Sequence, residues 1–165
     1  MPDVLPREVV ELAARVVEEN RKIGRRIVLA ESCTGGLVAA ALTEIAGSST
    51  VFDRGYVTYS NSAKHDCLGV SDDIIDTFGA VSVACVYAMA HGALARCDAA
   101  DVAVAISGVA GPDGGSEEKP VGTVVFARVV RGEDNPTAEH RVFAETTRSG
   151  VRLQATLCAL ELLLP

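Results

Sequence analysis

The sequence predicts a three-layer α/β/α domain, built on a mixed β-sheet, that occupies residues 1–165. Three observations support this fold class. Short apolar segments alternate with amphipathic ones in the first half, strand-like segments follow one another in the second half, and an amphipathic helix over residues 149–164 ends the chain. Alternation favours parallel strands with helices on the faces of the sheet, and adjacent strands favour antiparallel pairing. The expected order is α-β-α-β-α-α-β-β-β-α.

The chain is expected to begin with a helix over residues 6–24, because Pro6 suits a first helical turn, apolar side chains recur at helical spacing and Gly24 suits a helix end. The apolar run IVLA at residues 27–30 predicts a short buried strand. A turn at residues 31–36 separates this strand from the next helix.

That second helix is expected over residues 37–45 and ends at a glycine and two serines. Alternating side chains rich in β-formers predict a strand over residues 51–59. Two short helices follow, one over residues 61–68 and one, with a capping serine and two aspartates at its start, over residues 71–79.

The second half begins with an alanine-rich helix over residues 82–97 and a strand over residues 102–107. Glycine and proline then predict a long loop over residues 108–120. Two strands, joined by a polar turn, are expected over residues 121–130 and 141–146.

Charge and cysteine content exclude several classes of protein. The chain has 15 Lys and Arg against 22 Asp and Glu, a net charge of −7, and its basic run at residues 21–26 is interpreted as a solvated helix end, so we expect no nucleic-acid partner. Five cysteines without a C-x-x-C pair indicate a reduced, cytoplasmic chain with neither disulfides nor structural zinc. Residues 77–95 carry no charge but contain glycine, histidine and much alanine, which favours a buried helix over a membrane span.

The first candidate site is AESCTGG at residues 30–36. It lies where a strand ends and a helix begins, which is where ligands bind in open α/β sheets. Ser32 and Thr34 supply hydroxyl groups, and Gly35 and Gly36 permit a close approach of the backbone to an anion. The alternative is structural: the hydroxyl groups cap the helix and the glycines allow the turn.

The second candidate is the segment from Tyr59 to Lys64. A lysine acts as a general base near neutral pH when its surroundings lower its pKa from about 10.4 toward roughly 7–8. Tyr59 is suited to relay a proton or to orient a substrate. The alternative is an exposed lysine on a short helix.

The third candidate is the glycine-rich segment SGVAGPDGG at residues 107–115. Its density of glycine exceeds what an ordinary turn needs, so we expect its backbone to approach a ligand rather than to form a flexible hairpin connection. The residues concerned are Ser107, Gly108, Gly111, Gly114 and Gly115.

Arg148 and Arg152 form the fourth candidate, four residues apart at the start of the last helix. Arginines are disfavoured at a helix N-terminus unless an anion is bound, so a phosphate would explain them; the alternative is a surface pair offset by Glu145. The three histidines have no metal-ligand spacing, and no metal is expected.

Taken together, these segments resemble the CinA C-terminal domain family, also called the nicotinamide-nucleotide amidase (PncC-type) family. The resemblance extends from about residue 6 to the end, and Thr146 and Thr147 depart from it where the family often has Gly-Asp. The chain resembles the stand-alone form, without the N-terminal module of longer CinA proteins. The matching segments are AESCTGG at 30–36, AGSS at 46–49, RGYVTYSNSAK at 54–64, GAVS at 79–82, SGVAGPDGG at 107–115 and KPVGTV at 119–124.

The resemblance implies hydrolysis of the carboxamide of nicotinamide mononucleotide to nicotinate mononucleotide and ammonia, in pyridine-nucleotide recycling and without a cofactor. An amidase needs a nucleophile, a proton shuttle and oxyanion donors. We assign these roles to Ser32 as nucleophile, Lys64 as base and Tyr59 as a proton-transfer aid, with Thr34 as the rival nucleophile. Ser49 is expected to bind substrate.

The remaining roles follow from the same resemblance. Backbone amides at residues 34–36 would bind the oxyanion or the phosphate, the loop at residues 107–115 would enclose the nucleotide, and Arg148 or Arg152, from this chain or a neighbouring subunit, would bind phosphate. Cys33 is interpreted as a packing residue, because no base for a thiolate is evident. We expect a homo-oligomer with the alanine-rich helix or the apolar last helix at its interface; the alternative is that these helices face the core, which gives the same pattern. Two other functions stay open: a non-catalytic, competence- or damage-associated regulatory module, and a nucleotide-binding subunit that acts through a partner chain.

Overall fold

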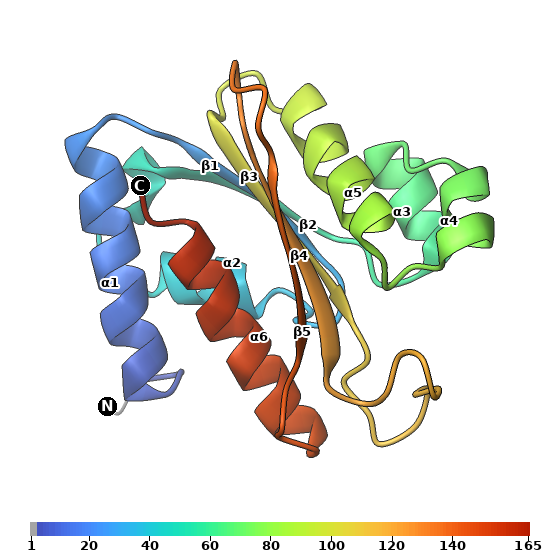
Figure 1. The fold of residues 1–165 in the computed structure, drawn as a ribbon. Helices are drawn as coiled ribbons and strands as arrows, with labels where there is room; N and C mark the ends of the chain where they lie inside the picture. The colour runs from blue at the N-terminus through green and yellow to red at the C-terminus, as the bar shows by residue number, and fades with distance from the viewer. Residues whose placement is uncertain (1–2) are drawn as a thin grey trace.

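The computed structural model describes residues 3–165 and contains one five-stranded mixed sheet (Figure 1). The strand order is β2-β1-β3-β4-β5. β1 pairs in parallel with β2 and β3, whereas β4 runs antiparallel to both β3 and β5. The strands are β1 (Ile27–Glu31), β2 (Phe52–Val57), β3 (Val102–Gly108), β4 (Thr123–Val130) and β5 (Thr137–Val142). The predicted mixed sheet is therefore confirmed.

Helices cover both faces of this sheet, as Figure 1 shows, which confirms the three-layer prediction. One layer contains α1 (Arg7–Lys22), α2 (Leu37–Thr43) and α6 (Arg148–Leu162). The other contains α3 (Asn61–Leu68), α4 (Asp72–Phe78) and α5 (Val83–Ala95). A 3-10 helix, η1 (Ser48–Thr50), precedes β2. Within residues 3–165, no helix has both the length and the apolar character needed to cross a membrane.

The two faces of the sheet enclose two separate cores. In β3, Val104 and Ile106 belong to the core beneath α1, α2 and α6, whereas Ala103 and Ala105 belong to the core beneath α5. This alternation follows from the two-residue period of a strand. The small alanines let α5 lie close to the sheet. At Gly92 of α5, a Cβ atom would lie 2.0 Å from the carbonyl oxygen of Leu68, so α3 and α5 touch through backbone.

The prediction for β5 was wrong. The strand lies at Thr137–Val142, not at residues 141–146. It is an edge strand whose side chains are mostly exposed, so no apolar alternation marks it in the sequence. Its position is set instead by pairing with β4, where Ala127 faces Ala138.

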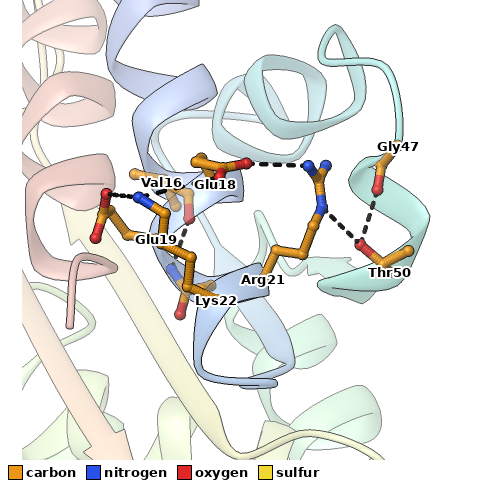
Figure 2. Close-up of polar contacts among 8 residues, drawn as sticks. Val16, Glu18, Glu19, Arg21, Lys22, Gly47 and Thr50 are labelled. Carbon is orange, nitrogen blue, oxygen red and sulfur yellow. Dashed lines mark hydrogen bonds and ion pairs between the residues drawn. The ribbon is translucent and has the colours of Figure 1, made fainter.

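The basic end of α1 is neutralised locally, as Figure 2 shows. Arg21 pairs with Glu18 at 3.0 Å, Lys22 pairs with Glu19 at 3.0 Å, and Arg21 also donates to the hydroxyl of Thr50 in η1 at 3.5 Å. Exposed ion pairs of this kind contribute about 0–1 kcal/mol each. These contacts attach α1 to the segment that leads into β2.

Candidate active site

The turn that contains Ser32 begins where β1 ends. Ser32 N–H donates to the carbonyl oxygen of Ile106 at 3.0 Å. Ser32 is therefore still hydrogen-bonded to β3, one residue beyond the end of β1. Gly35 and Gly36 then adopt positive φ values of 59° and 96°, which reverse the chain into α2. The Ser32 side chain is thereby held at the carboxyl edge of two parallel strands, where the sequence predicts a ligand site.

Lys64 lies on α3, and its side chain reaches the turn that contains Ser32. β2 ends at Val57, two residues leave the sheet, and the hydroxyl of Ser60 caps α3 by accepting from Ala63 N–H. Lys64 Nζ then lies 3.0 Å from Ser32 Oγ, and the lysine is only 1% exposed. Burial lowers the pKa of Lys64, because the charged form loses its hydration.

Two further contacts of Lys64 Nζ determine whether the amine donates a hydrogen bond to Ser32 or accepts one from it. Lys64 Nζ donates to the carbonyl oxygens of Thr58 at 2.8 Å and Tyr59 at 3.3 Å. Carbonyl oxygens only accept hydrogen bonds, so a neutral amine must give both its N–H groups to them. Its lone pair is then left for the third neighbour, the hydroxyl of Ser32. With a neutral amine, this geometry suits a general base beside a hydroxyl nucleophile.

Tyr59 and Arg148 lie at the edge of the same site. Arg148 Nη2 donates to the hydroxyl of Tyr59 at 2.8 Å, and its Nη1 donates to the carbonyl oxygen of Gly111 at 2.7 Å. These partners are neutral, and no carboxylate among residues 3–165 lies within ion-pair distance of the Arg148 guanidinium. The first residue of α6 is therefore tied both to the segment after β2 and to the glycine-rich loop.

A cavity of about 260 Å³ connects these groups. Among the predicted site residues, it is lined by Ser32, Tyr59, Lys64, Ser107, Gly108 and Arg148. Cys33 also lines it, and so do four residues that were not predicted as site residues from the sequence: Asn61, Ala80, Val81 and Ala110. They lie inside segments that the family resemblance marks, but alanine and valine carry no chemistry that would identify them, and Asn61 is one of several polar residues in its turn.

The structure does not place Thr34 at the cavity. Thr34 is 0% exposed, its hydroxyl has no hydrogen-bond partner among the described residues, and it lies outside the cavity lining. No base is within hydrogen-bonding distance of this hydroxyl, so the rival assignment of Thr34 as nucleophile is not supported. The turn directs Ser32 toward Lys64 and Thr34 into the interior.

The expected use of the Gly35 and Gly36 amides is also wrong. Gly35 N–H donates to the carbonyl oxygen of Ser32 at 2.9 Å, and Gly36 N–H donates to the carboxylate of Glu31 at 3.0 Å. Both donors are already satisfied within the protein, so neither is available to an oxyanion or a phosphate.

Ser49 lies at the opposite edge of the sheet. It belongs to η1, which precedes β2, and the neighbouring Val51 carbonyl accepts from Ile27 at the start of β1. The turn that contains Ser32 follows the other end of β1. Ser49 therefore cannot contact a ligand held at Ser32.

The glycine-rich loop and Arg152 contribute differently from the prediction. Gly111 takes part through its carbonyl oxygen, which binds Arg148, whereas Gly114 and Gly115 do not line the cavity. Arg152 also lies outside the lining. Its Nε donates to the carbonyl oxygen of Cys33 at 3.1 Å and its Nη2 to that of Thr34 at 3.3 Å.

Cys33 lies in the same turn as Ser32 but is unsuited to attack. The residue is 5% exposed, and burial raises the pKa of its thiol to about 11. A thiol with that pKa stays protonated near neutral pH, and the thiolate is the nucleophilic form. Within residues 3–165, no three His, Cys, Asp or Glu side chains form a group that could hold a metal ion.

The sequence profile of the CinA C-terminal domain matches residues 9–165. The chain belongs to this family. The resemblance inferred from the six CinA-like segments is thereby confirmed.

Two relatives named nicotinamide-nucleotide amidohydrolase match over nearly their whole length. The nicotinamide-nucleotide amidohydrolase PncC of Escherichia coli K12 is 50% identical over 157 residues, which cover 94% of this chain and 93% of the relative. The protein of the same name from Enterobacter agglomerans is 50% identical over 151 residues, 92% of this chain and 90% of the relative.

A solved structure of the competence/damage inducible protein CihA from Agrobacterium tumefaciens superposes with a TM-score of 0.94 at 48% identity, covering 98% of this chain and 97% of the other. A CinA-superfamily protein from Klebsiella pneumoniae gives a TM-score of 0.88 at 40% identity, over 94% of each chain. The α/β fold is thus shared with CinA-superfamily proteins.

Proposed function

We propose that the chain hydrolyses the carboxamide of nicotinamide mononucleotide to nicotinate mononucleotide and ammonia, in pyridine-nucleotide recycling. Relatives that are 50% identical over more than nine-tenths of this chain bear the name of nicotinamide-nucleotide amidohydrolase. The observation that carries the proposal is the 3.0 Å contact between Lys64 Nζ and Ser32 Oγ. It pairs a hydroxyl nucleophile with a buried base at the wall of a cavity.

The proposed reaction has two halves. Ser32 Oγ attacks the carboxamide carbon while Lys64 takes the hydroxyl proton. Lys64 then returns this proton to the departing nitrogen, so that the C–N bond breaks, ammonia leaves and an ester to Ser32 remains. Water, activated by the same amine, hydrolyses the ester and regenerates Ser32. No step in this scheme calls for a metal or an organic cofactor.

Arg148 is proposed to bind the phosphate of the nucleotide. Arg148 lines the cavity, and the partners of its guanidinium among the described residues are neutral, Tyr59 Oη and the Gly111 carbonyl oxygen. Arginine binds phosphate through charge-assisted, often paired hydrogen bonds. Tyr59 therefore acts through its hydroxyl on Arg148 and through its carbonyl oxygen on Lys64, which suits orientation of the site better than proton relay.

A cytoplasmic location and a homo-oligomer stay predictions. An apolar groove of about 280 Å³, lined by residues of α1, α2 and α6 and by Leu5 and Pro6, offers a candidate contact surface. Light scattering on the purified protein, at several concentrations, measures the mass of the particle and decides between a monomer and an oligomer.

The function is tested by the release of ammonia from nicotinamide mononucleotide by purified protein without added metal. We expect turnover by the parent and none by Ser32→Ala. Ser71→Ala is the matched control, because it also removes a serine hydroxyl, the one that caps α4 outside the cavity. Binding of the nucleotide without ammonia release from the parent would contradict the proposal and favour a non-catalytic binding module.

A further inference from the structure

The residue directly before Ser32 in the sequence carries a buried carboxylate. Glu31, the residue before Ser32, is 1% exposed. Its Oε2 accepts from Gly36 N–H at 3.0 Å and Val38 N–H at 3.2 Å, and its Oε1 accepts from Ala39 N–H at 2.9 Å. These three backbone donors are the carboxylate's hydrogen-bond partners among the described residues. The side chain of Glu31 thus joins the end of β1 to the start of α2 across the turn.

Arg152 holds the same turn from α6. It donates to the carbonyl oxygens of Cys33 and Thr34, and a Cβ atom at Gly35 would lie 3.3 Å from its Nη2. Figure 1 shows α6 running beside α2 on this face of the sheet. Glu31 therefore binds N–H groups at the end of the turn and in the first turn of α2, and Arg152 binds the carbonyl groups in the middle of the turn.

The hydrogen bonds of the turn leave two N–H groups free. Those of Ser32, Gly35 and Gly36 each have an acceptor, whereas those of Cys33 and Thr34 donate to no oxygen among residues 3–165. Donors next to a serine nucleophile are suited to stabilise an oxyanion, and displacement of reacting groups by about 1 Å can cost on the order of 10²-fold in rate. Of these two residues only Cys33 lines the cavity, and the direction of its N–H depends on how the turn is held.

We propose that Glu31 and Arg152 are positioning residues, which hold the turn so that Ser32 Oγ faces Lys64 and the N–H of Cys33, which lines the cavity, serves the oxyanion. The inference rests on the proposed function in taking Ser32 as the nucleophile. It assigns Arg152 to the backbone of the turn instead of to the phosphate. Loss of either side chain then lowers the reactivity of Ser32 and leaves nucleotide affinity in place.

The test measures the reactivity of Ser32 directly. A fluorophosphonate probe forms a bond from Ser32 Oγ to phosphorus, fluoride leaves and Lys64 takes the hydroxyl proton, so intact-mass spectrometry gives the labelling rate without any nucleotide. Glu31→Gln and Arg152→Met are compared with the parent. Arg131→Met is the matched control, because Arg131 also binds backbone carbonyls, those of Leu94, Cys97 and Ala100, but lies outside the cavity.

We expect Glu31→Gln and Arg152→Met to label at least tenfold more slowly than the parent. Their dissociation constants for nicotinate mononucleotide, measured by calorimetry, should stay within about threefold, and Arg131→Met should label at the parent rate even if its unfolding temperature falls. Arg152→Met decides the proposal if Glu31→Gln does not fold.

Labelling of both variants within twofold of the parent overturns the proposal. A tenfold loss of nucleotide affinity in Arg152→Met, with labelling unchanged, overturns it too and returns Arg152 to phosphate binding. A parent that labels at Ser32 but releases no ammonia contradicts the proposed substrate alone, whereas a parent that does not label at Ser32 contradicts this inference.

Discussion

Replacement of Lys64 by methionine removes the proposed base and keeps an unbranched side chain of similar length. Lys64 Nζ lies 3.0 Å from Ser32 Oγ, so the substitution takes away the acceptor for the hydroxyl proton. A positioned general base contributes on the order of 10²–10⁴ in rate, which corresponds to about 2.7–5.4 kcal/mol of transition-state stabilisation. We therefore expect kcat of Lys64→Met to fall by that factor, with a smaller change in KM.

The pH dependence gives a second readout of the same group. Only the neutral amine accepts the proton, so kcat/KM of the parent should rise with pH up to the pKa of Lys64. Because burial lowers that pKa, the plateau should begin below about 10.4. The residual rate of Lys64→Met should lack this rise.

Stability is linked to the same proton. With its pKa lowered, folded Lys64 binds fewer protons than unfolded Lys64 between the folded pKa and about 10.4. The free energy of unfolding of the parent should therefore increase with pH across that interval, relative to Lys64→Met.

Ammonia release from nicotinamide mononucleotide gives kcat and KM at each pH. Urea titration at the same pH values gives the free energy of unfolding. Lys22→Met is the control, since Lys22 pairs with Glu19 on the exposed side of α1 and should keep the parent rate and pH profile (Figure 2). A kcat for Lys64→Met within tenfold of the parent, or an acid limb that persists in the variant, would refute the role of Lys64 as base.

Three other substitutions test separate parts of the structure. Arg148→Gln should raise KM about tenfold or more, because a hydrogen bond to a charged group contributes about 1.5–3 kcal/mol, and an unchanged KM in steady-state kinetics would exclude phosphate binding there. Cys33→Ala should keep kcat within about threefold, and iodoacetamide at pH 7 should leave the parent active, because burial raises the Cys33 pKa to about 11; rapid inactivation that Cys33→Ala abolishes would contradict this. Phe126→Ala should lower the free energy of unfolding by about 3–5 kcal/mol in urea titration, because Phe126 is 0% exposed in the core beneath α6, and a loss under 1 kcal/mol would contradict that packing.

The segments that sequence reasoning located correctly are those whose signals are local. The apolar run of β1, the glycine turn after it and the amphipathic pattern of α1 each depend on neighbouring residues, so the structure has them near the predicted positions. β5 was displaced in the prediction because an exposed edge strand has no such pattern and takes its register from β4.

By itself, the sequence determined the family, the mixed α/β fold and the presence of Ser32, Tyr59, Lys64 and Arg148 as chemically capable groups. Only the tertiary structure decided what each hydroxyl, amide and guanidinium contacts. Lys64 reaches Ser32 across 32 positions of sequence, Thr34 turns inward although it is two residues from Ser32, and Arg152 binds carbonyl oxygens from 118 and 119 positions away. The physical reason is that hydrogen bonds are made over about 3 Å in space, whereas a sequence pattern reports only the neighbours along one strand or one helix.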